Sequence, residues 1–315
     1  MNSDKYVVVI GAANIDIGGT PYKELILSDS NPGYISFSYG GVGRNIAHNL
    51  AKLGTSVKLI TALGDDFLGD YLINVCEEAG IDMSSSVRLP GRHSSSYMFI
   101  NDGQGDMHVA IAHVDIVNKI TPEMIDNAAD VINGAELVVA DCNLSHETLM
   151  HIKEICKVPI CVETVSQAHA SKIKGNLDGL YMIKPNRLEA ELLTELSINN
   201  DEDFIEAAHN ILGQGVEKVF ISMGERGVLA ADKDNTYIDV ADKIEIVNTT
   251  GAGDSATAAV VWSLLGSEGK TSMDTLKYAA KAANCTASLT IRSSSTVSEE
   301  LSEDTLIEMI NNKVN

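Results

Sequence analysis

The chain has 315 residues, of which 44% are hydrophobic and 21% are charged, and its formal net charge is −21. This composition is typical of a globular protein with one large α/β domain or two smaller ones. The negative charge argues against a nucleic-acid backbone or an anionic membrane as partner, because both attract clustered Lys and Arg. A phosphate ligand stays open, since backbone N–H groups and a metal ion can hold it locally.

The five cysteines are an odd number without the spacing of a metal site, which predicts reduced side chains. They are Cys76, Cys142, Cys156, Cys161 and Cys285. The sequence also shows no signal peptide and no apolar run long enough to cross a bilayer. We therefore expect a cytoplasmic protein.

The first predicted strand, residues 6–10, is an apolar run too short for a helix and typical of a strand buried on both faces. Ligands of open α/β sheets bind beyond the carboxyl ends of the strands, so Asn14 and Asp16 are placed to grip a diol. Turn formation by these two residues is an equally good interpretation. The glycine-rich segment 40–45 then precedes a predicted helix over 46–53, and its spacing differs from that of dinucleotide-binding proteins, which excludes NAD.

After a predicted strand over 57–63 and a helix over 67–79, two alternating runs indicate a hairpin. Residues 94–100 and 107–112 flank turn-forming residues. An isolated hairpin is marginally stable in water, so we expect it to pair with residues 17–38 as a small sheet. Such an excursion from an α/β body could serve as a lid or as a dimer surface.

Beyond residue 115, strands and helices alternate regularly, and two strand ends carry candidate ligand contacts. Asn186 and Glu189 follow a predicted strand over 180–183 and could order a hydrated Mg²⁺, although a helix-capping box explains them as well. Ser222 ends the next strand. Gly224 and Gly227 could bring backbone close to a nucleotide, or form a plain turn.

The segment 248–265 is the most informative one. The β-branched residues over 244–247 predict a strand, and the apolar spacing after Ser255 predicts a helix. Between them lie three small residues, 251–253, where helix N–H groups and the helix dipole favour phosphate. Asp254 would repel phosphate, so it points to a second task, the removal of a proton from a hydroxyl. The alternative is that Asp254 only caps the helix.

Four motifs, in this order, resemble the ribokinase (PfkB-type) family of carbohydrate and nucleoside kinases. They are Asn-x-Asp at 14–16, Gly-Gly-x-Gly-x-Asn at 40–45, Asn-x-x-Glu at 186–189 and Thr-Gly-Ala-Gly-Asp at 250–254. The resemblance covers nearly the whole chain. It implies a single kinase domain over 1–315, a three-layer α/β sandwich with a mainly parallel sheet, and a small inserted β-sheet lid from about 17–38 and 94–113.

The resemblance also implies ATP and Mg²⁺ and assigns roles to residues. The catalytic set is Asp254 as the base, with Gly251, Ala252 and Gly253 as the anion hole. The substrate contacts are Asn14, Asp16, Gly41 and Asn45. The ATP contacts are Asn186, Ser222, Gly224, Gly227, Thr250 and Asn284, with Glu189 on the metal side. In several members the lid also joins two subunits, which leaves open a homodimer through the lid.

Within the family, the strings at 30–33, 40–47, 139–143 and 184–191 are most similar to members that phosphorylate pseudouridine, which implies transfer to its 5′-hydroxyl. A kinase for ribose, another nucleoside or a hexose stays open, as does a non-catalytic nucleoside-binding protein on this fold. Two departures stand out. Asn248 replaces an Asp of many members near a K⁺ site, which leaves K⁺ activation open, and Glu163 stands where the pseudouridine kinases often have Asp.

Overall fold

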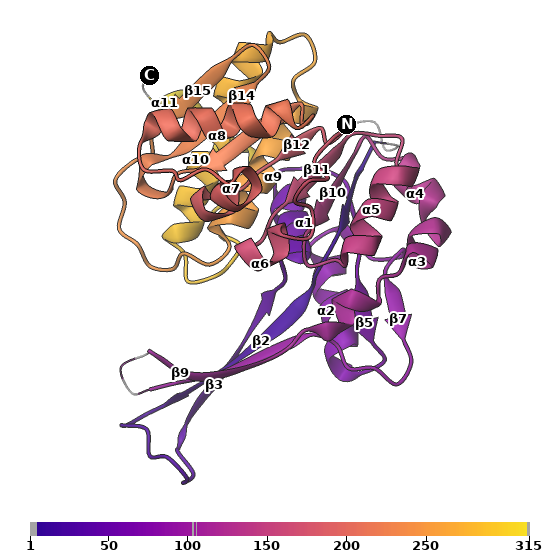
Figure 1. Ribbon diagram of the computed structural model, residues 1–315. Coiled ribbons are helices and arrows are strands. Elements are labelled where there is room, and N and C mark those ends of the chain that lie inside the picture. Colours follow the sequence, from indigo (N-terminus) through magenta and orange to yellow (C-terminus); the bar gives the residue numbers. More distant parts are fainter. Residues whose placement is uncertain (1–4, 103, 105, 314–315) are drawn as a thin grey trace.

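The computed structural model describes residues 5–102, 104 and 106–313, and it is built on a nine-stranded sheet (Figure 1). In spatial order the strands are β15 (Thr236–Asp239), β14 (Val228–Asp232), β13 (Lys218–Ser222), β12 (Met182–Ile183), β11 (Ile160–Glu163), β10 (Leu137–Asp141), β1 (Val7–Ile10), β4 (Val57–Ile60) and β6 (Ile81–Asp82). Neighbouring strands from β6 to β13 are parallel, and β14 and β15 complete the sheet in antiparallel pairs. The predicted mainly parallel sheet is confirmed.

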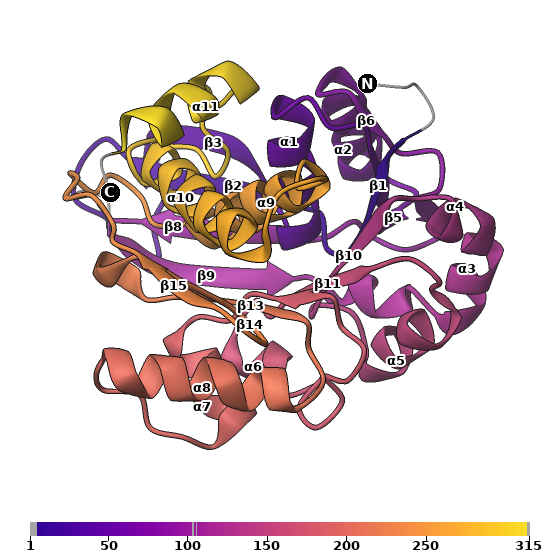
Figure 2. The same cartoon turned by 90° about the horizontal axis from the view of Figure 1, so that it is seen from above.

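Helices cover both faces of this sheet, which explains why β1 is apolar throughout. Val7 and Val9 belong to one core cluster, Val8 and Ile10 to the other, and all four are buried. The first cluster is covered by α1 (Val42–Lys52), α2 (Phe67–Glu78), α9 (Ala252–Leu265), α10 (Ser272–Ile291) and α11 (Glu303–Asn312). The second is covered by α3 (Pro122–Asn127), α4 (Ala129–Asn133), α5 (His146–Ile155), α7 (Arg187–Thr194) and α8 (Asp201–Gly213). This is the predicted three-layer sandwich (Figure 2).

A separate four-stranded sheet extends from the body (Figure 1). Its order is β3 (Gly33–Gly40), β2 (Asn14–Pro21), β8 (Ser96–Asn101) and β9 (Met107–His113). The predicted hairpin is therefore confirmed as β8 and β9, and it pairs with the segment 17–38 as expected. Two short strands, β5 (Ala62–Gly64) and β7 (Val87–Leu89), pair beside the body.

The register divides the side chains of the four-stranded sheet between two faces. One face, here called the inner face, carries Asp16, Ser36, Ser38, Tyr97 and Phe99. The opposite face, here called the outer face, carries Ile17, Ile35, Phe37, Met98, Ile100, Val109 and Ile111. The sheet thus has one mixed face and one face whose distal part is apolar, while Tyr39, Ser96 and His113 lie on the outer face near the body.

A predicted strand and the predicted start of a helix are wrong. Residues 244–247 form no strand, because the N–H groups of Val247 and Asn248 donate to the carbonyl of Ile291 at the end of α10, at 2.9 and 3.0 Å. Helix α1 begins at Val42 rather than at residue 46, so the glycine-rich segment enters its first turn.

The cysteines agree with expectation: all five are free, and four of them are buried. Among the helices that the structure describes, none is long and apolar enough to cross a membrane.

Candidate active site

The glycine turn before α9 packs tightly against the C-terminal part of the chain. Gly251 holds the N-cap position with φ of 85°, and a Cβ there would lie 2.3 Å from the carbonyl oxygen of Thr296. Only glycine accepts both the conformation and the close approach. Ala252, Gly253 and Asp254 form the first turn, where helix N–H groups lack partners within the helix. The start of α9 therefore lies where the sequence predicts it, and its role as an anion hole stays a prediction.

Asp254 does not cap this helix, so the capping interpretation is wrong. Its Oδ2 accepts a hydrogen bond of 2.7 Å from Nδ2 of Asn45 on α1. Burial raises the pKa of Asp254 from 3.8 to about 7, with contributions from the Glu163 and Asp141 carboxylates, while the Asn45 hydrogen bond and the Lys184 charge act in the opposite direction. A carboxylate with a pKa near 7 can take a proton at neutral pH.

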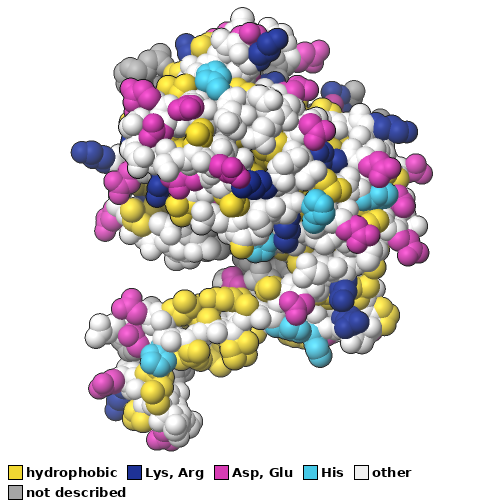
Figure 3. Space-filling view, viewed as in Figure 1, with side chains coloured by type: hydrophobic (Ala, Val, Ile, Leu, Met, Phe, Trp, Pro, Cys, Tyr) yellow, Lys and Arg dark blue, Asp and Glu magenta, His cyan; other side chains and the backbone are white. Residues whose placement is uncertain are grey.

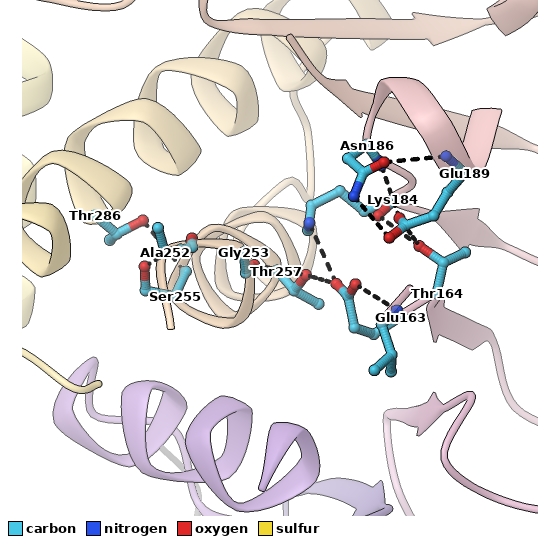
Figure 4. Close-up of polar contacts among 11 residues, drawn as sticks. Glu163, Thr164, Lys184, Asn186, Glu189, Ala252, Gly253, Ser255, Thr257 and Thr286 are labelled. Carbon is cyan, nitrogen blue, oxygen red and sulfur yellow. Dashed lines mark hydrogen bonds and ion pairs between the residues drawn. The ribbon is translucent and has the colours of Figure 1, made fainter. Parts of the chain in front are cut away.

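A buried ion pair, which the sequence did not reveal, lies beside the same turn (Figure 4). Lys184 Nζ is 3.2 Å from Glu163 Oε2, and the two side chains are 3% and 6% exposed. Glu163 also accepts a hydrogen bond from Thr257 Oγ1 on α9, which ties β11 to this helix. A Cβ on Gly253 would lie 3.9 Å from Lys184 Nζ, so the ammonium group borders the glycine turn. The sequence motif over 184–191 contains Lys184, but nothing in that motif predicted a role for the lysine.

Asn186 and Glu189 form the capping box that the sequence left open, at the start of α7. Glu189 N–H donates to Asn186 Oδ1 at 3.0 Å, and Asn186 N–H donates to Glu189 Oε2 at 2.9 Å. Thr164 Oγ1 donates to the same carboxylate at 2.6 Å, and Glu189 is 2% exposed (Figure 4). Because these oxygens already accept hydrogen bonds, the pair fits a Mg²⁺ ion reached through water, the form in which Mg²⁺ is commonly bound.

Ser222 lies next to this motif, because it forms an isolated parallel bridge with Asn186. The turn that follows contains Gly224 and Gly227, with φ of 64° and 102°. Met223 N–H donates to the Gly227 carbonyl at 2.8 Å, which closes the turn. The end of β13 and the turn that follows it thus lie at the same edge of the sheet as Asn186.

Asn284 on α10 lies near that turn through a shared neighbour. Its Nδ2 donates to the Asp239 carbonyl at 2.8 Å, and a Cβ on Gly227 would lie 1.9 Å from the same oxygen. The N–H group of Thr250 donates a hydrogen bond of 3.0 Å to Oδ1 of Asn248. The K⁺ site expected near Asn248 stays a prediction.

One large cavity, of about 890 Å³, separates the body from the inner face of the four-stranded sheet. The hollow between them is visible in Figure 3. The predicted residues that line it are Asn14, Asp16, Gly41, Asn45, Thr250 and Asp254. Lining residues that were not predicted include Arg44, His48, Tyr97, Phe99, Asn143 and Thr296. The structure therefore brings the substrate-side residues and the candidate base to one cavity.

Asn14 and Asp16 lie at the start of β2 rather than in a turn, so the turn interpretation is wrong. Asn14 Nδ2 donates to Asp16 Oδ1 at 2.6 Å, and burial raises the pKa of Asp16. Gly41 has φ of 92°, and a Cβ there would lie 2.4 Å from the Ala12 carbonyl oxygen. Its close backbone approach explains the glycine.

Asp141, at the end of β10, is a further buried carboxylate that the sequence did not single out. It is fully buried and accepts hydrogen bonds from the N–H groups of Ala12 and Asn143, both at 2.9 Å. Burial raises the pKa of Asp141 to about 6. A Cβ on Gly11 would lie 2.2 Å from its Oδ2, so Gly11 makes room for the carboxylate.

Comparison with known proteins identifies the family of this chain. The sequence pattern of the pfkB family carbohydrate kinases matches residues 4–303. The chain is 38% identical over 262 residues to pseudouridine kinase of Escherichia coli (strain K12), covering 82% of this chain and 84% of that protein. A carbohydrate kinase from Agrobacterium tumefaciens matches with a TM-score of 0.84 at 27% identity, over 98% of this chain and 97% of that one. Arabidopsis thaliana ribokinase complexed with ribose and ATP matches with a TM-score of 0.79 at 21% identity, over 98% and 99%.

The chain therefore belongs to the pfkB family of carbohydrate kinases. It is a phosphotransferase with an alcohol group as acceptor, acting on a small sugar or nucleoside. Kinases of this family use ATP, generally with Mg²⁺.

Asp254→Asn is expected to stabilise the protein at pH 8 but not at pH 4. The folded-state pKa of about 7 lies above the ordinary 3.8, so the stability associated with this group is present below pH 4 and is lost as the pH rises through 7. A neutral amide removes that loss. The unfolding temperature of the variant should exceed that of the parent by about 4 °C at pH 8, measured by differential scanning fluorimetry. Asp304→Asn, the same change on an exposed residue, controls for the substitution, and an equal shift at both pH values would contradict the assignment.

Proposed function

We propose that this protein transfers the γ-phosphoryl group of ATP to the 5′-hydroxyl of pseudouridine. The observation that carries the proposal is the position of Asp254, whose pKa is about 7, between the glycine turn of α9 and the cavity of about 890 Å³. The 38% identity to the Escherichia coli pseudouridine kinase supports this particular acceptor.

In the proposed reaction, the oxygen of the acceptor hydroxyl bonds to the γ-phosphorus, and Asp254 accepts the proton of that hydroxyl. The bond between that phosphorus and the bridging oxygen breaks, and ADP leaves. N–H groups of the turn over 251–253 would stabilise the charge of the transferring group, and Lys184, which borders this turn, would add a positive charge beside them. Phosphoryl transfer depends mainly on positioning and on charge stabilisation of this kind.

The ATP side of the proposed site follows the carboxyl edge of the sheet. Asn186 and Glu189 would hold Mg²⁺ through water, and the ion would neutralise phosphate charge. The remaining ATP contacts would come from Ser222, Gly224, Gly227, Thr250 and Asn284. The connection of Ser222 to Asn186, and of Gly227 to Asn284 through Asp239, supports a continuous nucleotide site.

The acceptor would lie between the body and the inner face. Asn14, Asp16, Gly41 and Asn45 would bind its sugar hydroxyls. The cavity is large enough for a nucleoside, because clefts of several hundred Å³ hold drug-sized ligands.

Two aromatic rings on the inner face suit a flat base. The rings of Tyr97 and Phe99 have centroids 6.0 Å apart. A Cβ on Gly18 would lie 2.5 Å from the Phe99 ring, so the absence of a side chain there lets this ring lie across β2. Stacking of a base on such rings is favourable for any flat heterocycle. We propose that the four-stranded sheet is a lid of a single kinase domain over 1–315, and that its closure excludes water from the transfer.

The first experiment measures ATP consumption with pseudouridine, uridine, adenosine, ribose and fructose, with and without Mg²⁺. We expect strong preference for pseudouridine, a 5′-monophosphate product and dependence on Mg²⁺. Asp254→Asn should lower kcat by about 10²- to 10⁴-fold, and the parent should lose activity as the pH falls through about 7. Preference for ribose or fructose would overturn the acceptor, and saturable nucleoside binding without turnover would indicate a non-catalytic binding protein.

Phe99→Ala should distinguish a nucleoside site from a sugar site. Loss of one stacking ring is expected to raise KM for pseudouridine by about tenfold, while KM for ATP stays unchanged. Phe67→Ala removes an exposed phenylalanine ring of α2 that does not line this cavity, and it serves as the control. If Phe99→Ala weakens ribose and pseudouridine equally, the ring does not contact the base.

We also propose that the outer face binds a second copy of this chain. Near the body, Ile17 packs against the core, and the Tyr39 hydroxyl forms a hydrogen bond of 2.8 Å with the Tyr71 hydroxyl of α2. The half of the outer face that lies farther from the body is exposed. There Ile35 and Ile111 are 70% and 68% exposed, with Phe37, Met98 and Val109 exposed around them. A continuous apolar patch of this kind marks an interaction site, and two such faces complement each other under two-fold symmetry.

Ile111→Lys tests this interface. Sedimentation velocity of the parent should give the mass of a dimer, and the lysine variant the mass of a monomer, because a charge would be buried without a partner. Ile307→Lys changes an exposed isoleucine of α11 and should leave the dimer intact. A monomeric parent, or a dimer that Ile111→Lys does not dissociate, would contradict the proposed interface.

A further inference from the structure

Arg44 is a buried charge at the edge of the cavity to which no role has yet been assigned. Its side chain is 2% exposed in the first turn of α1. The guanidinium donates to the carbonyl of Gly40 at 3.3 Å and to that of Tyr39 at 2.8 Å, and it lies 3.1 Å from His48 Nδ1. Among the residues that the structure describes, no ion pair joins Arg44 to a carboxylate, although buried charges are normally paired. Its neutral partners need an explanation.

The explanation lies in the amide of Asn45, which Arg44 and Asp254 approach from opposite sides. Arg44 Nη2 donates to Asn45 Oδ1, and Asn45 Nδ2 donates to Asp254 Oδ2 at 2.7 Å. A guanidinium has only donors, and an ionised carboxylate has only acceptors. A reversed amide would place its NH₂ group against Arg44 and its oxygen against Asp254. The two neighbours therefore permit one orientation.

We propose that Arg44 is a positioning residue for phosphoryl transfer, which acts by holding the Asn45 amide so that its NH₂ group fixes the Asp254 carboxylate in place. The inference rests on the proposed role of Asp254 as the base. Thr296 belongs to the same arrangement, because its Oγ1 lies 3.3 Å from both Arg44 Nη2 and Asn45 Oδ1.

Thr296 also extends the arrangement to the rest of the cavity wall. Its Oγ1 donates to the Tyr39 carbonyl at 3.1 Å, the same oxygen that Arg44 bonds. Gly251, which starts the glycine turn, packs against the Thr296 carbonyl. Arg44 thus links the end of β3, the start of α1 and the loop beside the turn of α9. A bidentate planar donor can make these bonds at fixed angles, and a lysine ammonium cannot reproduce all of them.

The charges around Asp254 set the consequence of losing Arg44. The carboxylates of Glu163 and Asp141 oppose ionisation of Asp254, and Lys184 favours it. Arg44 attracts Asp254 and also attracts Asp16 across the cavity. Without Arg44 the Asn45 amide could rotate, and ionised Asp254 would lose both a hydrogen bond and a nearby positive charge, which raises its pKa further.

A double-mutant cycle of Arg44→Met and Asn45→Ala tests the inference with two measurements. The first is the pH titration of the Asp254 side-chain carboxyl by ¹³C NMR, assigned with Asp254→Asn, which needs no substrate. The second is the steady-state rate with the best acceptor. In the parent background, Arg44→Met should raise the titration midpoint by about half a pH unit or more. It should lower kcat by about 30-fold and leave KM for ATP unchanged.

In the Asn45→Ala background, Arg44→Met should change kcat by less than about threefold, because residues that act through one another are not additive. Equal effects in both backgrounds, or an unchanged titration midpoint, would overturn the proposal. Arg88→Met, which removes a half-exposed guanidinium from the pairs with Asp65 and Asp70, is the control.

If Arg44→Met does not fold, Arg44→Lys replaces it in the cycle with the same expected non-additivity. The two readouts also separate this inference from the proposed function. A parent that phosphorylates no acceptor would contradict the kinase reaction, whereas the carboxyl titration would still decide whether Arg44 acts on Asp254 through Asn45.

Discussion

Three buried or half-buried carboxylates crowd the start of α9, and the structure depends on the groups that hold them apart and in place. Asp254, Glu163 and Asp141 come from one helix and two neighbouring strand ends. Burial is the main reason why the pKa of Asp254 rises to about 7 and that of Asp141 to about 6, and the Glu163 and Asp141 carboxylates add to the shift at Asp254. Lys184 pairs with Glu163 directly, whereas Asp254 accepts its hydrogen bond from a neutral amide. The base thus keeps a raised pKa while its neighbour is neutralised.

The fold makes this crowding unavoidable. In a parallel sheet the carboxyl ends of neighbouring strands meet at one edge, and ligands bind there. The ends of β10, β11 and β12 bring Asp141, Glu163 and Lys184 to that edge, and α9 begins directly above it. The chain as a whole carries a net charge of −21. An anion such as ATP is therefore attracted by local features, the helix start and the buried lysine, and not by the overall field.

Local motifs predicted much of the site, because their information lies within a few residues. The glycine turn with Asp254, the Asn186–Glu189 pair and the glycines of α1 all lie where the sequence places them. Contacts between distant segments could not be predicted in this way. The Thr257–Glu163 bond spans 94 residues, and nothing near either residue indicates the other.

The β-sheet predictions show the same limit. Alternation revealed the hairpin β8–β9, but the face that Tyr97 and Phe99 occupy depends on the register with β2, which the sequence does not contain. The strand predicted over 244–247 failed for a related reason. Its β-branched residues suit a strand, yet Val247 and Asn248 bond to the end of α10 instead.

The catalytic role proposed for Asp254 also explains why the protein retains a carboxylate whose ionised form is disfavoured by burial. A base with an ordinary carboxylate pKa would be ionised at neutral pH, but it would bind a hydroxyl proton weakly. Crowding and burial strengthen the base and disfavour the folded state above pH 7, which is a common compromise at functional sites. In the proposed reaction the incoming phosphates add further negative charge, so some interaction must keep Asp254 ionised. The Asn45 hydrogen bond stabilises ionised Asp254 without a formal charge beside the phosphate. Arg44 lies behind the Asn45 amide and supplies positive charge from a greater distance. It therefore does not compete with the acceptor hydroxyl for Asp254.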